Sequence, residues 1–266
     1  MRDIRPAYSI GIPLGSMLLF LAVAIASPAA YAAYVRKHEV GVQDFATPIL
    51  LVPAIIFSLV SLRRRQQLPA KWLTVWLGLV TLGAVFFCGE ECSWGQNYLH
   101  WVTPEGWSEI NKQHETNLHN TSNLFNHVPR ALLSMAAWCC VVAPCVLYRQ
   151  RQQWKPGTSP WAWFWPTAAV VPTALVASLV DIPQKFHGQY LKDVTEATWY
   201  GELFLDGRHS EMKEYFLAMF MLMYLWSFAT RLGSLNEMDL AAGNSDSGAA
   251  DSSKLPSSGD RHAAAA

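Results

Sequence analysis

Six stretches of apolar residues recur along the chain, and short polar segments separate them. They cover 10–35, 46–62, 72–89, 128–148, 161–182 and 215–230, about 16–26 residues each. A helix needs roughly 20 apolar residues to cross a bilayer core. Lipid cannot satisfy open backbone groups, so each stretch is predicted to be helical. The pattern therefore predicts an all-α protein, a polytopic bundle of about six transmembrane helices.

The first stretch has a second interpretation. Arg2 and Arg5 precede it, and Ala30-Tyr31-Ala32 resembles the small-residue site at which a signal peptide is cleaved. The stretch is long for a signal peptide, so a retained helix is favoured. The remaining five stretches are predicted to have the same topology in either case.

Basic residues predict the orientation. They occur before the first stretch, after the second, after the fourth and after the sixth, at Arg2, Arg5, Arg63, Arg64, Arg65, Lys71, Arg149, Arg151, Lys155 and Arg231. Cytoplasmic connections are enriched in Lys and Arg. We therefore expect a bacterial inner-membrane protein with both termini in the cytoplasm. The long connections 90–127 and 183–212 are expected on the periplasmic or extracellular side.

The C-terminal segment has a different composition from the rest of the chain. It is rich in Ser, Gly, Ala and Asp and has no apolar period, which is typical of disorder. We predict a transmembrane helical domain over 1–233 and a disordered cytoplasmic tail over 234–266.

Composition agrees with a membrane protein and indicates the partners. Only 15% of the 266 residues are charged, against about 25% in soluble domains. The 20 basic and 20 acidic residues form no long basic run, so no nucleic-acid partner is expected. The 12 Trp favour contact with membrane lipids, because Trp is enriched at membrane interfaces. Cys88 and Cys92 are four residues apart, and packing is favoured for them over a disulfide or a metal role.

Acidic residues collect at the predicted outer ends of three apolar stretches. Glu90 and Glu91 follow the third, Asp181 ends the fifth, and Glu214 leads into the sixth. A carboxylate at the end of a helix is often simply hydrated. Burying it at a membrane boundary is costly, so a buried one marks a functional site. The convergence of three helix ends favours a functional interpretation.

A short interfacial amphipathic helix is predicted between the third and fourth stretches. Thr103-Pro104-Glu105 is typical of a helix start. Glu115 and His119 lie four residues apart and would project from one face of this helix. Such a pair can bind a metal ion or act as an oriented acid–base pair. A hydrated polar face is the alternative.

Two strings in this region resemble those of a group of uncharacterised bacterial polytopic membrane proteins. The first runs from Gly89 to Gln96 (GEECSWGQ) and matches a GEE-x-SWGQ turn. The second runs from Asn111 to Asn120 and matches N-x-Q-x-E-x-N-L-H-N. The resemblance covers about 40 residues and implies no activity. A distant analogy links the chain to the alkaline ceramidase-like membrane hydrolases, but it lacks their HxxxH near the last span and has six predicted spans instead of seven.

These residues favour a metal-dependent hydrolase that acts on a lipid or lipid-linked substrate at the outer face. The expected cofactor is a divalent metal, with zinc favoured because it activates bound water near neutral pH. The predicted metal ligands are Glu91, Glu115, His119 and Glu214. The predicted catalytic residues are Glu90, Glu91, Glu115 and Asp181. Two alternatives remain open: a transporter of a small solute or ion, and a non-catalytic membrane anchor that docks a protein partner.

Overall fold

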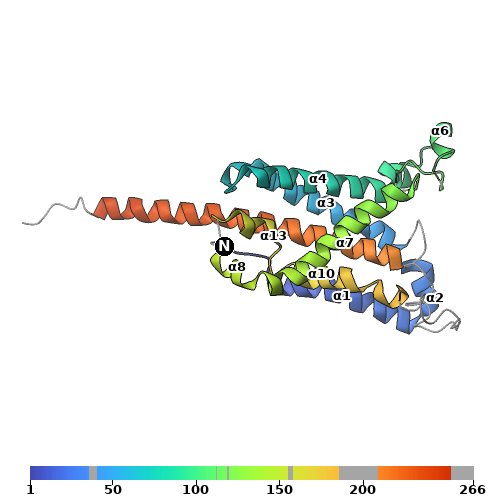
Figure 1. The fold of residues 1–266 in the computed structure, drawn as a ribbon, viewed down its shortest axis with the longest axis horizontal. Coiled ribbons are helices and arrows are strands. Elements are labelled where there is room, and N and C mark those ends of the chain that lie inside the picture. Colours follow the sequence, from blue (N-terminus) through green and yellow to red (C-terminus); the bar gives the residue numbers. More distant parts are fainter. Residues whose placement is uncertain (36–40, 112, 119, 155–157, 186–208, 253–266) are drawn as a thin grey trace, which may run out of the picture.

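The computed structural model describes residues 1–35, 41–111, 113–118, 120–154, 158–185 and 209–252, and every regular element in them is a helix (Figure 1). The prediction of an all-α protein is confirmed. The elements are α1 (Pro6–Ala26), α2 (Pro28–Ala30), the π-helix η1 (Tyr31–Val35), α3 (Val42–Arg63), η2 (Arg65–Gln67), α4 (Lys71–Glu91), η3 (Ser93–Gly95), α5 (Gln96–Leu99), α6 (Glu105–Ser108), α7 (Asn123–Val146), α8 (Tyr148–Gln153), α9 (Pro160–Phe164), α10 (Val171–Leu179) and α13 (His209–Ser252).

Five helices in the described part of the chain are long and apolar enough to cross a membrane. The spans are Pro6–Ala26, Phe45–Arg63, Lys71–Glu91, Leu124–Val146 and Glu211–Leu235. Four of them expose large apolar side chains, including Leu19, Ile49, Leu82 and Leu132. Lipid would cover such surfaces, whereas soluble proteins rarely expose them over whole helices. A multi-pass membrane protein explains these surfaces.

The apolar run at 161–182 does not form one helix. Helix α9 ends at Phe164 and α10 begins at Val171. Pro166 explains the break, because proline donates no backbone hydrogen bond and disfavours the helical conformation in the residue before it. Trp165 is accordingly extended (φ −75°, ψ 135°). The fifth predicted span is thus interrupted.

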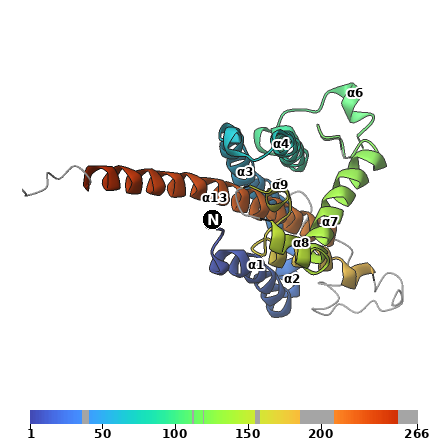
Figure 2. The same cartoon turned by 60° about the vertical axis from the view of Figure 1, so that its left-hand side comes forward.

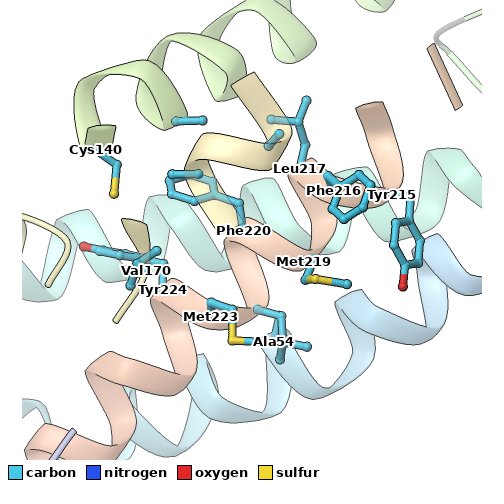
Figure 3. Packing of buried hydrophobic residues seen from close by; sticks show 14 of the residues in the cluster. Ala54, Cys140, Val170, Tyr215, Phe216, Leu217, Met219, Phe220, Met223 and Tyr224 are labelled. Atoms are coloured by element: carbon cyan, nitrogen blue, oxygen red, sulfur yellow. The ribbon is translucent and has the colours of Figure 1, made fainter. Parts of the chain in front are cut away.

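Helix α13 forms the centre of the bundle. In its span 78% of the residues are buried, against 17–33% in the other four spans. It packs along α3 and against α10, while α4 packs on α3 and both α1 and α7 pack on α10. Figures 1 and 2 place α3 and α4 on one side of α13 and α1 on the other. Apolar side chains point from α13 in several directions, among them Tyr215, Phe216, Phe220 and Met223 (Figure 3). A helix that is apolar around its circumference is typical of such a buried position.

The bundle has two different ends (Figure 1). We call one the N-terminal end, because it holds the N-terminus, the α3–α4 connection and α8. We call the other the cap end; it holds α2, α6 and the first turns of α7 and α13. At the N-terminal end the Arg2 backbone N–H donates to Ser234 Oγ (3.2 Å), and Arg64 lies beside Gly233. The basic residues at 2, 64 and 231 thus share one end, as their alternation along the chain predicts.

Two predicted elements look different in the structure. Helix α13 continues to Ser252, past the predicted start of a disordered tail at 234. Extending a helix is easier than starting one, because each further residue that is ordered adds one hydrogen bond. The predicted amphipathic helix is not confirmed, because α6 ends at Ser108 and the residues after it form turns. The division into two domains stays a prediction.

Candidate functional site

The end of α4 turns sharply back on itself. Ser93, Trp94 and Gly95 all have positive φ angles, of 47°, 55° and 102°. This left-handed stretch brings the Trp94 ring onto Gly89, where a Cβ atom would lie 2.8 Å from ring carbons. Glycine at 89 therefore permits the contact, and consecutive left-handed residues other than glycine indicate local strain.

Glu90 is the buried member of the predicted acidic pair. Its side chain accepts a hydrogen bond from Trp94 Nε1 (2.7 Å) and one from the backbone N–H of Leu118 (2.7 Å). Only 3% of Glu90 is exposed, whereas Glu91 is half-buried. Glu90 thus fastens the end of α4 to the second sequence string.

Glu115 joins the two strings at a second point. Its carboxylate accepts a hydrogen bond from the Ser93 hydroxyl (2.7 Å) and another from the Asn117 amide. The Asn117 amide also donates to Ser93 Oγ (3.0 Å). A hydroxyl held by a carboxylate is an arrangement in which the carboxylate can accept the hydroxyl proton.

Asn111 holds the described residues that follow it in turns. Its side-chain oxygen accepts the backbone N–H groups of Gln113 (3.0 Å) and Glu115 (3.2 Å). Its amide donates to the backbone oxygen of Asn117 (2.8 Å), and His114 has a φ of 57°. Side-chain to backbone bonds of this kind compete with the helix. Glu115 therefore lies in a turn and not on a helix. His119, its predicted partner, lies outside the described residues.

We call Glu90, Ser93, Asn111, Glu115 and Asn117 the cap cluster. Asn111, Asn117 and Ser93 are at most 2% exposed. Outside the cluster, Gln96 reinforces the same join, because its side-chain oxygen accepts the Thr116 backbone N–H (2.6 Å). The motif residues thus bond mainly to one another. Sequence reasoning missed the roles of Ser93, Asn111 and Asn117, although all three lie within the two strings.

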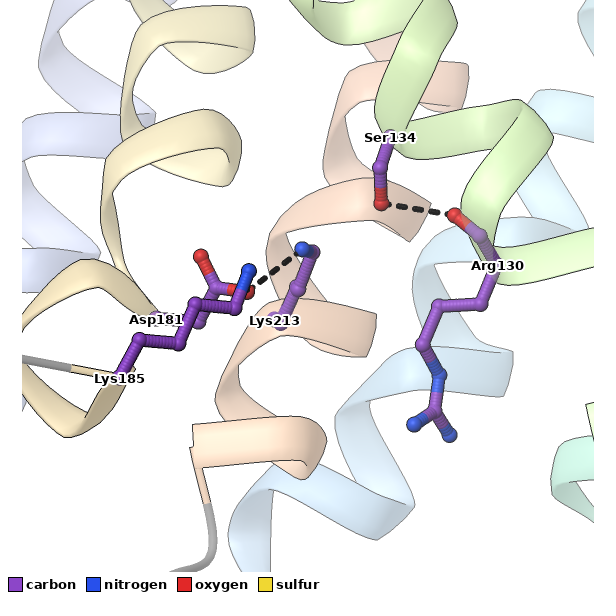
Figure 4. Close-up of polar contacts among 5 residues, drawn as sticks. All are labelled: Arg130, Ser134, Asp181, Lys185 and Lys213. Atoms are coloured by element: carbon purple, nitrogen blue, oxygen red, sulfur yellow. Dashed lines mark hydrogen bonds and ion pairs between the residues drawn. The ribbon is translucent and has the colours of Figure 1, made fainter. Parts of the chain in front are cut away.

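The other two predicted acids form ion pairs inside the bundle. The Asp181 carboxylate lies 2.7 Å from Lys213 Nζ and 2.8 Å from Lys185 Nζ (Figure 4). Glu214 is paired with Arg130 of α7. We call these five residues the ion-pair cluster. Their side chains join α7, the end of α10 and the first turns of α13.

Burial distinguishes the members of the ion-pair cluster. The side chains of Asp181, Lys213 and Glu214 are 10%, 13% and 8% exposed, while that of Lys185 is 71% exposed. The buried acids are therefore neutralised by cations from neighbouring helices. Arg130 and Lys213 were not predicted as partners of these acids. Their positions could have indicated it, because Arg130 lies inside an apolar run and Lys213 lies beside one.

The predicted metal site is not assembled among the residues that the structure describes. No group of three or more His, Cys, Asp and Glu in them is placed to hold a metal ion. His119, a predicted ligand, lies outside the described residues. Glu115 accepts two hydrogen bonds, and Glu214 faces an arginine. A zinc site at this end stays a prediction.

Cys92 follows the end of α4 and is a free, half-buried thiol, as is Cys88. The neighbouring Cys88 thiol and the backbone near Gly95 lower the pKa of Cys92 to about 6, although partial burial acts in the opposite direction. A cysteine with a lowered pKa is partly thiolate at neutral pH and therefore reactive.

Comparison with protein-family models, with curated proteins and with solved structures gives no match. The cap cluster and the ion-pair cluster are therefore interpreted from their own geometry and chemistry.

Proposed function

We propose that the chain crosses a bacterial inner membrane six times, with α9 and α10 together forming the interrupted fifth crossing. Five long apolar helices and the apolar character of 161–182 support this topology. The basic residues at the N-terminal end favour the cytoplasm for that end. The cap end would then face the periplasm or the outside. Reporter fusions at residues 68 and 106 test this, because only the second is expected to be translocated.

We further propose that the cap end binds and transports a small charged solute through the ion-pair cluster. One observation carries this proposal: Lys213 and Glu214, neighbours on α13, are paired to opposite charges just after α10 and on α7. Ionisable residues inside membrane proteins are expensive and typically line ion or substrate pathways.

The physical basis is exchange of partners. An incoming anion would compete with Asp181 or Glu214 for their cations, and an incoming cation would compete with Lys213 or Arg130. Exchange is favourable only if the solute replaces the lost partner, because an unpaired buried charge is strongly destabilising.

Uptake into proteoliposomes tests transport. A panel of amino acids, dicarboxylates and inorganic ions would be screened with the full chain, with proton movement followed by an entrapped dye. For the solute that is taken up, Asp181→Asn and Glu214→Gln should lower uptake at least tenfold. Glu105→Gln is the matched control, because Glu105 is exposed on α6. Equal uptake by all variants, or no uptake of any panel member, would count against transport.

A second candidate is the hydrolase of a lipid or lipid-linked substrate, with the cap cluster as its site. It is favoured by the Ser93 hydroxyl that donates to Glu115 from a left-handed backbone position. Strained backbone next to an oriented carboxylate is a common property of catalytic sites. A zinc ion held by Glu91, Glu115, His119 and Glu214 would supply an activated water in the metal-dependent form of this proposal.

Metal analysis separates the two forms of the hydrolase proposal. Zinc in a one-to-one ratio, lost in Glu115→Ala and His119→Ala but retained in Glu109→Ala, would support the metal-dependent form. Hydrolysis of extracted membrane lipids without bound metal, abolished by Ser93→Ala, would support the serine form. A folded wild-type protein with neither property would exclude both.

A further inference from the structure

Arg231 of α13 is buried at the N-terminal end of the bundle, away from both clusters described above. Only 4% of the residue is exposed. Ser234, one turn further along α13, accepts the backbone N–H of Arg2, so the first residues of the chain pass over this position. A charged side chain in such a place requires partners that compensate for the water it has lost.

The guanidinium group is only partly satisfied. Nη1 donates to the backbone oxygen of Ala162 (2.8 Å), and Nε donates to that of Ser227 (3.3 Å). Nη2 is fully buried and has no hydrogen-bond partner. The group lies over the rings of Trp163 (5.2 Å to the centroid) and Phe228 (5.7 Å). Arginine is well suited to such stacked positions, and its free N–H groups still seek an acceptor.

Trp163 provides a second unsatisfied donor at the same place. The residue is fully buried, and its Nε1 also has no hydrogen-bond partner. A buried donor without a partner is costly. Two such donors on residues in contact, one of them on a charged guanidinium group, are unusual. Asp3 lies close enough to attract Arg231 electrostatically but does not form an ion pair with it among the described residues. The site thus offers donors and positive charge, and it needs an anionic acceptor.

We propose that the phosphate of an anionic phospholipid headgroup accepts hydrogen bonds from the two unpartnered donors, Nη2 of Arg231 and Nε1 of Trp163. The position supports a lipid source, since Arg231 lies four residues before the end of the span Glu211–Leu235, at headgroup depth. Other basic groups surround it: Arg64 lies beside Gly233, and Arg151 donates to Pro166. Basic pockets between transmembrane helices on the cytoplasmic side are known to bind such headgroups. Free phosphate offers the same oxygens and is the other possible source.

Thermal unfolding of the full chain in nanodiscs tests the proposal. The discs contain phosphatidylcholine alone, phosphatidylcholine with phosphatidylglycerol, or phosphatidylcholine with inorganic phosphate in the buffer. A ligand that binds only the folded protein raises its unfolding temperature. We expect the unfolding temperature to rise with phosphatidylglycerol. Titrating the phosphatidylglycerol content of the discs then gives an affinity. Trp163→Phe keeps the ring and removes the donor, so the affinity should fall severalfold; Arg231→Gln should lower it about tenfold or more.

Two further variants make the test specific. Asp3→Asn removes the competing carboxylate and should strengthen binding severalfold. Arg149→Gln removes an exposed arginine of α8 and should leave the affinity unchanged. An equal unfolding temperature in all three conditions would overturn the proposal, and so would equal losses in Arg149→Gln and Trp163→Phe. A rise with inorganic phosphate as large as that with phosphatidylglycerol would retain the anion site and assign it to free phosphate, overturning the lipid assignment.

Discussion

Neighbouring residues at the end of α4 have different structural roles. Gly89 accommodates the Trp94 ring, Glu90 binds the ring nitrogen and the Leu118 backbone, and Glu91 remains half-buried. The turn is therefore built from one small residue and one buried carboxylate. A change of one methyl group or one charge should be measurable here.

Gly89→Ala should destabilise the protein, because the new Cβ would lie 2.8 Å from the Trp94 ring. The ring or the helix must then move, at a cost of about 1–3 kcal/mol. Gly78→Ala in the same helix is the control, since nothing lies within 4 Å of its Cβ position. It should be neutral or stabilise by up to about 1 kcal/mol. Unfolding in detergent measures both, and equal effects would contradict the proposed contact.

Cys92 should react with iodoacetamide at an unusually low pH. Its pKa of about 6 implies that the labelling rate rises through pH 6 and is near its plateau at pH 7.5. Cys88→Ala removes the largest cause of the shift, so the rise should move toward the ordinary thiol pKa of about 8.5. Labelling rates against pH, in a background without Cys139, Cys140 and Cys145, would measure this. An unchanged profile in Cys88→Ala would assign the shift to the backbone instead.

Pairs of helices are joined at the cap end by charge. Arg130 connects α7 to α13 through Glu214, and Asp181 connects the end of α10 to α13 through Lys213. Each ion pair joins two elements at a defined position, whereas apolar packing alone is less specific about their relative position along the helix axes. The ion-pair cluster therefore adds specific contacts to the apolar packing of α7, α10 and α13.

Glu214→Gln should destabilise the bundle by about 2 kcal/mol. This lies between the ~1 kcal/mol of exposed pairs and the ~3–5 kcal/mol of fully buried ones, because the Arg130 side chain is 29% exposed. Adding Arg130→Gln should recover part of the loss, and the double-mutant cycle measures the coupling. Lys185→Ala, at a side chain 71% exposed, should change stability by less than about 1 kcal/mol. Additive losses in the cycle would exclude a direct pair.

The whole molecule is organised around α13. In the other four spans 17–33% of the residues are buried, while α13 is enclosed by them, with 78% of its residues buried. Packing on α13, and not exclusion from water, should therefore dominate the stability of the bundle within the membrane.

Leu217→Ala should destabilise the protein by about 2–5 kcal/mol, because Leu217 is fully buried and its loss leaves a cavity. Leu82→Ala is the matched control on α4, where the side chain is 67% exposed and lipid would replace the lost contacts. It should change stability by less than about 1 kcal/mol. Unfolding in mixed micelles would measure both, and similar losses would contradict a central α13.

The helices were largely predictable from the sequence because they depend on local properties. Three of the six apolar runs, the second, third and fourth, correspond to α3, α4 and α7, which begin and end within about five residues of the prediction. The break at Trp165 was a missed local signal, since Pro166 was visible in the sequence. The early end of α6 was not predictable in this way, because it depends on bonds from Asn111 to residues in a turn.

The candidate site was predictable in its composition and not in its contacts. Glu90, Asp181 and Glu214 could be selected as acids at helix ends, and all three are buried. Glu115 could be selected from its spacing of four residues to His119. The structure assigns them to two clusters, because each carboxylate binds the nearest donors on other segments. Ser93, Lys213 and Arg130 became site residues only through these partners.

The sequence by itself determined that the chain is helical, with several segments long and apolar enough to cross a membrane. Helix formation in lipid follows from backbone hydrogen bonding and apolar length, which are properties of each segment alone. The tertiary structure decided that α13 lies at the centre and that Glu90 and not Glu91 is buried. It also decided that Arg231 and Trp163, which lie side by side, each have a buried donor without a partner. These outcomes depend on which segments pack together, because the hydrogen-bond or ion-pair partner of a side chain can come from a residue distant in the sequence.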